Sequence, residues 1–393
     1  MKEFANLNPS ERILMGPGPS NIHRRVYEAM AKPTLGHLDP EFLAIMEEVQ
    51  ELLRWAFKTK NRMTLPVSAT GSAGMETCFA NLFERGEKVV IGVNGVFGMR
   101  MEQVAKKFGL QPVSLTKDWG KVFEPDVFEE VLKSESDVKG VAVVHAETST
   151  GARQPLEEIG QLCRKHDVLF LVDAVTSLGG IELEVDGWNI DACYSGTQKC
   201  LSCPPGLSPV TFSDRALDTM ANRKTDVESW YFDLNMLRNY WTTGKRAYHH
   251  TAPVNMNYAL REALLVLHEE GFKRIYARHV LNSSALLAGL AELGIEPLVE
   301  EEYRLPELNA VTIPEGIDDA AVRGSLLNDY NIEIGAGLGP FAGKIWRIGL
   351  MGQSSNQSNV ICFLYALEQI LNKLGSLSET GRAVPAAQAV YAG

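Results

Sequence analysis

The sequence lacks the marks of a membrane-spanning, secreted or nucleic-acid-binding protein. No apolar run approaches the ~18 residues that a bilayer-spanning helix needs, and the N-terminal residues contain no apolar core of the secretory kind. Lys and Arg number 38 against 49 Asp and Glu, a formal charge of −11, and no basic cluster is dense enough to follow a phosphate backbone. We therefore expect a cytoplasmic protein that has neither a membrane nor a nucleic acid as its partner.

Cysteine is scarce as well, with six residues in a chain of 393. Scattered cysteines in a long chain indicate reduced thiols and not a disulfide framework. Cys200 and Cys203 form a Cys-x-x-Cys pair, for which a redox dithiol or a metal site is an alternative. The pair runs into Pro204 instead of opening a helix whose dipole would lower a thiol pKa. A zinc site would need a second ligand pair, and the adjacent His249-His250 would point in different directions. We expect no metal site and interpret both thiols as packing residues.

The order of apolar patterns predicts an α/β protein of two unequal domains. Between about residues 64 and 212, short apolar runs alternate with helix-period segments, which predicts a mostly parallel sheet covered by helices. After Pro253 helical segments dominate and two strand-like runs remain, which predicts a smaller α+β domain. We place an N-terminal segment at 1–21, a large domain at 22–260, a small domain at 261–375 and a flexible tail at 376–393.

Polar, small or aromatic residues follow the predicted strands of the large domain. These clusters are Asn94–Phe97, His145–Thr148, Asp173–Thr176 and Ser195–Lys199. Because ligands of such sheets bind beyond the carboxyl ends of the strands, we expect these clusters to surround a site.

A loop of small residues, Thr70–Glu76, precedes a predicted helix. Backbone N–H groups and the hydroxyls of Thr70 and Ser72 could surround an anion there, helped by the helix dipole. A plain helix N-cap that uses Glu76 is the alternative. No Gly-Lys-Ser/Thr follows, so the loop is not a triphosphate-binding loop.

Two strand-end charges have the character of catalytic groups. Asp173 ends an apolar run, where a carboxylate is costly to bury unless a cation or a protonated ring nitrogen pairs with it; the alternative is an N-cap. Lys199 has few charged neighbours, so partial desolvation would lower its pKa and make it a nucleophile for aldehydes, whereas an ordinary lysine is a solvated surface group. With the anion loop and the aromatic Phe97, they form the set that pyridoxal phosphate requires.

Arg347 lies in a predicted strand of the second domain. A guanidinium fixed beside a cleft suits bidentate capture of a substrate carboxylate, and a structural surface arginine is the alternative.

In their order along the chain, these residues resemble the class V pyridoxal-phosphate aminotransferases, and among them the alanine/serine–glyoxylate aminotransferases. The matching motifs are Met15–Asn21, Gly36–Phe42, Asn94–Gly98, His145–Gly151, Asp173, Ser195–Cys200, Tyr248–Thr251 and Trp346–Gly349. The resemblance implies fold type I, with a mostly parallel seven-stranded sheet. It also implies a homodimer with shared active sites, in which residues 1–21 lie on the partner subunit.

The resemblance also implies roles for single residues. Lys199 would be catalytic, forming a Schiff base with the cofactor and moving the substrate's α-proton. The cofactor would be held by Thr70, Gly71, Ser72, Phe97, Thr148, Asp173, Gln198 and Lys199, joined by Tyr248 and Thr251 from the neighbouring subunit. The substrate would meet Arg347, Gly18, His37 and Tyr248.

The implied reaction moves an amino group from alanine or serine to glyoxylate. The motifs also resemble the (S)-ureidoglycine–glyoxylate aminotransferases, which tend to carry amide side chains at the positions of His37 and Tyr248, so these two residues favour alanine or serine. A cysteine desulfurase or another lyase of the same fold is a further alternative, but it needs a mobile cysteine loop, and Cys362 is on a predicted helix. Intact Lys199, Asp173 and Arg347 argue against a non-enzymatic binding protein.

Overall fold

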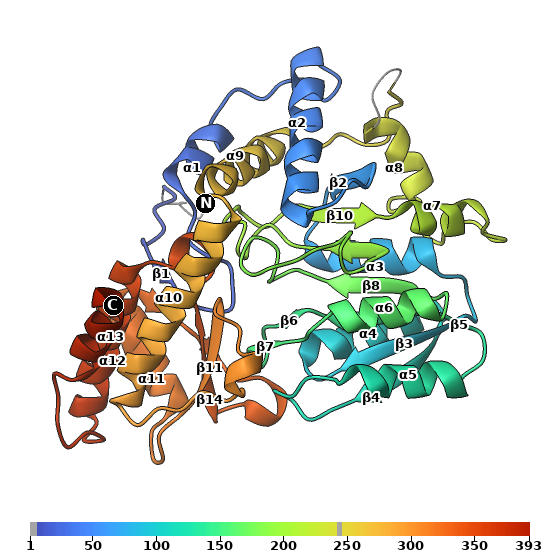
Figure 1. The fold of residues 1–393 in the computed structure, drawn as a ribbon. Helices are drawn as coiled ribbons and strands as arrows, with labels where there is room; N and C mark the ends of the chain where they lie inside the picture. The colour runs from blue at the N-terminus through green and yellow to red at the C-terminus, as the bar shows by residue number, and fades with distance from the viewer. Residues whose placement is uncertain (1–5, 242–245) are drawn as a thin grey trace, which may run out of the picture.

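A seven-stranded sheet forms the centre of the larger domain in the computed structural model, which describes residues 6–241 and 246–393 (Figure 1). Its strands are β2 (Met63–Val67), β3 (Lys88–Val93), β4 (Gln111–Thr116), β5 (Val138–Val144), β8 (Leu169–Asp173), β9 (Ala192–Tyr194) and β10 (Ser208–Phe212). They are ordered β2-β10-β9-β8-β5-β3-β4, and only β10 runs antiparallel to its neighbours. The expected α/β class with a mostly parallel sheet is confirmed.

The central strands are continuous apolar runs because helices cover both of their faces. Every run predicted as a strand in this domain overlaps an observed strand. The sequence analysis missed the two edge strands. β4 alternates between exposed and half-buried residues, and β2 contains Pro66, a residue tolerated at a sheet edge.

The helices of the large domain pack into one apolar cluster on each face of the sheet. They are α1 (Arg24–Met30), α2 (Pro40–Phe57), α3 (Gly71–Leu82), α4 (Val96–Lys107), α5 (Pro125–Ser134), α6 (Glu157–Lys165), α7 (Asp214–Ala221), α8 (Leu234–Trp241) and α9 (Val254–Glu270). Side chains of α3, α4, α7 and α8 join one cluster, and those of α5, α6 and α9 join the other. No helix among the described residues is long and apolar enough to cross a bilayer.

The smaller domain surrounds a three-stranded sheet ordered β11-β14-β13. Its elements are α10 (Phe272–Ala291), β11 (Leu308–Thr312), α11 (Asp319–Tyr330), β12 (Ile332–Glu333), β13 (Gly335–Ala336), β14 (Ile345–Gly349), α12 (Gln357–Lys373) and α13 (Ala383–Ala392), with short 3-10 turns at 301–303, 339–341 and 352–354. The buried Trp346 of β14 lies in the core of this domain. The expected domain boundary at 260/261 falls inside α9, which packs on α1 and α2.

The N-terminal segment lies on its own chain. β1 (Ile13–Leu14) pairs with β12, and the backbone of Met15 bonds to both Glu333 and Gly349. Ser20 then donates hydrogen bonds to the carbonyls of Gln198 and Lys199. Main-chain bonds thus tie residues 13–21 into the fold of their own chain, and the expectation that residues 1–21 lie on a partner subunit stays a prediction. Residues 1–5 of that expectation lie outside the described residues.

The C-terminal residues do not form the expected flexible tail. They include α13, which packs against α10 and α12 (Figure 1) and buries Ala383 and Ala387 completely. Sequence periodicity missed this helix because its contacts use alanine, which gives little amphipathic contrast. Small residues on α10 and α13 let these two helices approach closely, and Gly289 is one of those on α10.

A single methyl group tests this close packing. In the variant Gly289→Ala, the new Cβ would meet the side chain of Leu364 and lie 2.8 Å from the Ala383 carbonyl oxygen. We expect a loss of about 1–3 kcal/mol in the free energy of unfolding, measured by urea denaturation. Gly324→Ala is the control, because that helical position is open and alanine should stabilise α11 by about 0.5–1 kcal/mol. Equal effects of the two substitutions would contradict this account.

Candidate active site

A pocket of about 190 Å³ opens at the carboxyl ends of the central strands. Seven of the predicted site residues line it, namely Thr70, Gly71, Ser72, Phe97, Asp173, Gln198 and Lys199. Met75, Arg100, Val175 and Tyr194 complete the lining. The parallel sheet brings these residues together although they lie far apart in the sequence, as expected for strand-end loops.

The start of α3 forms one wall of the pocket. Thr70 is the N-cap residue, but its hydroxyl makes no capping hydrogen bond, so the plain N-cap alternative does not describe it. The side-chain oxygen of Gln198 is buried in the same region and has no hydrogen-bond partner among the described residues. Free backbone N–H groups at a helix start, together with unused polar side chains, suit an anionic group.

Asp173 lies at the floor of the pocket and is almost completely buried. Its carboxylate accepts hydrogen bonds from the Val175 amide, at 2.8 Å, and from the Tyr194 hydroxyl, at 2.7 Å. Burial raises the pKa of Asp173 to about 6, while these hydrogen bonds and the charge of Lys199 oppose the rise. A protonated ring nitrogen would supply the cationic partner that the buried carboxylate lacks here.

Lys199 is also buried, with 8% of its surface exposed. Its amine donates a hydrogen bond to the Pro17 carbonyl. Burial, together with the positive charge of Arg347, lowers the pKa of Lys199 to about 8. Gly18 packs on the lysine side chain, where a Cβ would lie 2.6 Å from Lys199 Cδ, and its φ of +101° also favours glycine.

Arg347 approaches the pocket from β14 of the small domain. Its Nε donates to the Ala336 carbonyl at 2.7 Å and its Nη1 to the Thr148 carbonyl at 3.0 Å. Burial lowers the pKa of Arg347, but a guanidinium stays charged at any physiological pH. Within the described residues no hydrogen bond involves Nη2, so the group retains donors for a carboxylate.

The sequence analysis missed two buried polar residues of the site. Tyr194 holds the Asp173 carboxylate, as described above. Glu147 accepts hydrogen bonds from the Phe97 amide at 3.0 Å and from the Ser149 hydroxyl at 2.6 Å, so it fixes the start of α4, where Phe97 lies. Glu147 lies in the motif His145–Gly151, and Tyr194 directly precedes the motif Ser195–Cys200. Their roles were hidden because hydrogen bonds between distant segments leave no sequence pattern.

Six predicted residues are not among those that line this pocket. Gly18 packs on Lys199, and Arg347 bonds to the Thr148 carbonyl, as described above. His37, Tyr248 and Thr251 form a separate group. Tyr248 is 60% exposed, and its hydroxyl is 3.4 Å from that of Thr251. The ring of His37 packs on Tyr248 with centroids 5.1 Å apart. The structure thus brings these three side chains together with each other and not with Lys199 of the same chain.

Comparison with known proteins gives consistent results. A family model described as class V aminotransferase matches residues 17–344. An alanine–glyoxylate aminotransferase from Drosophila melanogaster is 39% identical, over 93% of this chain and 94% of its own. The crystal structure of an alanine–glyoxylate aminotransferase from Nostoc sp. shares 48% identity with a TM-score of 0.92, and it covers 94% of this chain and 98% of that chain. The crystal structure of a ureidoglycine–glyoxylate aminotransferase from Bacillus subtilis shares 41% identity with a TM-score of 0.97, and it covers 99% of this chain and 100% of that chain.

The chain belongs to the class V aminotransferases. It is therefore a transaminase that depends on pyridoxal phosphate, as the sequence motifs indicated. The pocket of this class V aminotransferase fits that cofactor. The unpartnered Gln198 oxygen and the start of α3 suit the phosphate, and the buried Asp173 carboxylate suits a protonated ring nitrogen. We predict that Phe97 stacks on the ring and that Thr148 lies near its hydroxyl.

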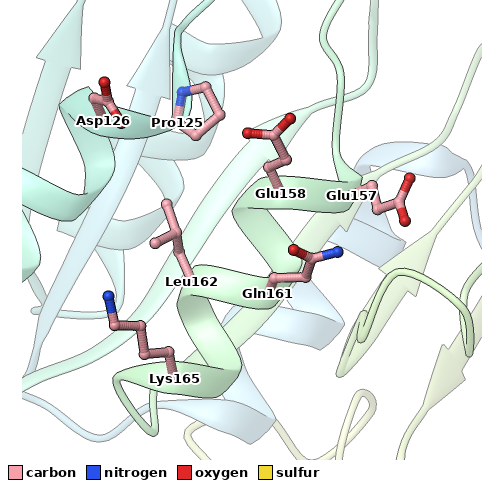
Figure 2. Close-up of a pocket in the computed structure, with 7 residues that line it drawn as sticks. All are labelled: Pro125, Asp126, Glu157, Glu158, Gln161, Leu162 and Lys165. Atoms are coloured by element: carbon pink, nitrogen blue, oxygen red, sulfur yellow. The ribbon is translucent and has the colours of Figure 1, made fainter.

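The other candidate sites of the class V aminotransferase have no comparable chemistry. Cys200 and Cys203 are buried, and burial raises the pKa of both thiols, so neither is an activated nucleophile. No cluster of metal-ligating side chains is found among the described residues. Figure 2 shows a hollow between α5 and α6, whose acidic residues Asp126, Glu157 and Glu158 are exposed to solvent.

The lowered pKa of Lys199 can be measured directly. In the apoprotein, the rate of Lys199 acetylation by acetic anhydride, followed by mass spectrometry, should rise with pH and reach half its maximum near pH 8, because only the neutral amine reacts. In Arg347→Met, loss of the neighbouring charge should move this midpoint upward. A midpoint near the ordinary lysine value of about 10.4 in the unsubstituted protein would refute the desolvated environment.

Proposed function

We propose that the protein transfers the amino group of a small amino acid, alanine or serine, to glyoxylate, giving glycine and pyruvate or hydroxypyruvate. One observation carries the proposal. The Arg347 guanidinium lies close enough to Lys199 to lower its pKa. A short substrate such as glyoxylate or alanine, anchored at Arg347 by its carboxylate, would therefore have its reacting carbon near Lys199.

The side chains of this site can be given consistent tasks. When bound, pyridoxal phosphate supplies an electron sink for the bond that breaks at the substrate's α-carbon. Lys199 Nζ, whose pKa is about 8, accepts the α-proton and returns it at the other end of the transfer. Asp173 holds a proton at the pyridine nitrogen, and Arg347 orients the substrate carboxylate. Burial of all three groups excludes water, which strengthens each charge interaction.

We infer the choice of donor from His37 and Tyr248, which pack on one another outside the pocket of their own chain. Both carry rings and no amide group, which favours alanine or serine over an amide-bearing donor. (S)-ureidoglycine is the second candidate, because a ureidoglycine–glyoxylate aminotransferase is among the relatives found. A desulfurase activity is disfavoured, since Cys362 lies within α12 and has no mobile loop.

A homodimer with shared active sites is part of the proposal. Tyr248 and Thr251 are exposed and lie outside the pocket of their own chain, which supports a place for them at the cofactor phosphate of a second subunit. We also propose that the enzyme works in the cytoplasm, which the six free cysteines suit.

An assay of glycine formation tests the proposed function. The purified enzyme is given glyoxylate with alanine, serine or (S)-ureidoglycine, and glycine is measured. We expect the highest kcat/KM with alanine or serine. No glycine with any donor would refute the reaction, and a strong preference for ureidoglycine would reverse the order of donors.

Loss of the substrate anchor should weaken substrate binding. We expect Arg347→Met to lower kcat/KM for the amino acid, and to raise the KM for glyoxylate, by about a hundredfold, because two charge-assisted hydrogen bonds are lost. Lys344→Met removes an exposed positive charge three residues away and should leave both constants unchanged. Equal effects of the two substitutions would show that general charge, and not a fixed anchor, attracts the substrate.

A further inference from the structure

Ser68 joins β2 to the start of α3 and is held at two of its atoms. Its hydroxyl is 2.7 Å from His250 Nε2, and its carbonyl accepts a hydrogen bond from the Tyr231 hydroxyl at 3.1 Å. Ser68 comes two residues before Thr70, the N-cap of α3. The Thr70 side chain makes no capping hydrogen bond, so it does not fix the first turn of α3. The position of this turn therefore depends on the preceding backbone, which includes Ser68.

His249 and His250 fix one another by a hydrogen bond of 2.8 Å between their Nδ1 atoms. His249 is 6% exposed and stacks on Trp230, with centroids 4.5 Å apart and ring planes 13° from parallel. The rings of Tyr231 and Tyr240 pack on His250 at 5.2 and 5.7 Å. The His250 ring therefore has a defined position and orientation from which to bind Ser68.

The contacts of this pair assign a direction to its hydrogen bonds. The Trp230 carbonyl, 3.4 Å from His249 Nε2, can only accept, so a neutral His249 accepts at Nδ1 from His250. His250 Nε2 then accepts the hydroxyl hydrogen of Ser68. Burial and the neighbouring His249 and His37 lower the pKa of His250 to about 4, so His250 is neutral at neutral pH. Among the residues that the structure describes, the other titratable side chains packed on His250 are Tyr231 and Tyr240.

We propose that His250, held by His249, is a positioning residue for the phosphate cradle at the start of α3. By fixing Ser68 it aims the backbone N–H groups of Gly71 and Ser72 and the hydroxyl of Thr70 into the pocket. This inference rests on the phosphate-binding role predicted for these three residues and not on the identity of the amino donor.

Preorganisation gives the physical reason. A flexible loop would have to be ordered when the phosphate binds, and the entropy of ordering would weaken binding. The hydrogen bonds of Ser68 order the loop in advance. Tyr248 and Thr251 flank the histidine pair in the sequence. In the proposed dimer, the pair would therefore position the start of α3 for the cofactor of its own chain, and Tyr248 and Thr251 for the cofactor of the neighbouring subunit.

Two amide substitutions of His250 separate this role from general packing. The amide group of Gln extends to about the place of the histidine Nε2 and can replace its contact with Ser68, whereas that of Asn reaches only the place of Nδ1. Ser68→Ala removes the hydroxyl itself. His268→Asn and Ser134→Ala are controls, because both residues are exposed and lie outside this cluster.

The apoprotein of each variant is titrated with pyridoxal phosphate and with pyridoxal, and the dissociation constants are measured by absorbance. For pyridoxal phosphate we expect a rise of about tenfold in His250→Asn and Ser68→Ala, near-normal binding in His250→Gln, and no additional loss in the double variant Ser68→Ala/His250→Asn. For pyridoxal, which lacks the phosphate, the constants should not change. Thermal melting of each apoprotein checks its folding.

Two results would overturn the inference: unchanged pyridoxal phosphate affinity in His250→Asn and Ser68→Ala, or equal losses for pyridoxal and pyridoxal phosphate. If His250→Asn does not fold, the comparison of Ser68→Ala with Ser134→Ala decides the question. Failure of the proposed function has a different signature, in which the unsubstituted protein binds pyridoxal phosphate tightly but forms no glycine.

Discussion

The chemistry of this enzyme depends on the desolvation of one amine. Lys199 is buried against Pro17 and Gly18, and the cation Arg347 adds its repulsion, so the amine loses its proton near pH 8. A solvated lysine would remain charged and could act neither as a nucleophile nor as a base. The packing around Lys199 is therefore a requirement of catalysis as well as of stability.

Three separate parts of the chain meet to create that environment. The large domain supplies Lys199 and Asp173 from neighbouring strand ends, the small domain supplies Arg347 from β14, and the N-terminal segment supplies the cover at Gly18. The parallel strands fix the distance between lysine and carboxylate. The Arg347–Thr148 hydrogen bond ties the two domains together at the proposed substrate anchor.

The sequence alone predicted the main features of the fold and site because they arise from local rules. Apolar runs and helical periods marked the central strands and the helices between them, and the residue types at the strand ends indicated the cofactor. Residues whose importance depends on distant contacts were missed. Tyr194 and Glu147 were given no role, and α13 was mistaken for a loose tail because alanine gives a weak pattern.

The sequence by itself thus determined the family, the cofactor and the lysine, since pyridoxal phosphate chemistry requires these residue types in this order. Only the tertiary structure decided the electrostatic state of Lys199, the hydrogen bonds that hold Asp173 and Arg347, and the link from His250 to Ser68. The physical reason is that burial, charge and hydrogen-bond geometry depend on atoms brought together from distant parts of the chain. These properties come into existence only when the chain folds.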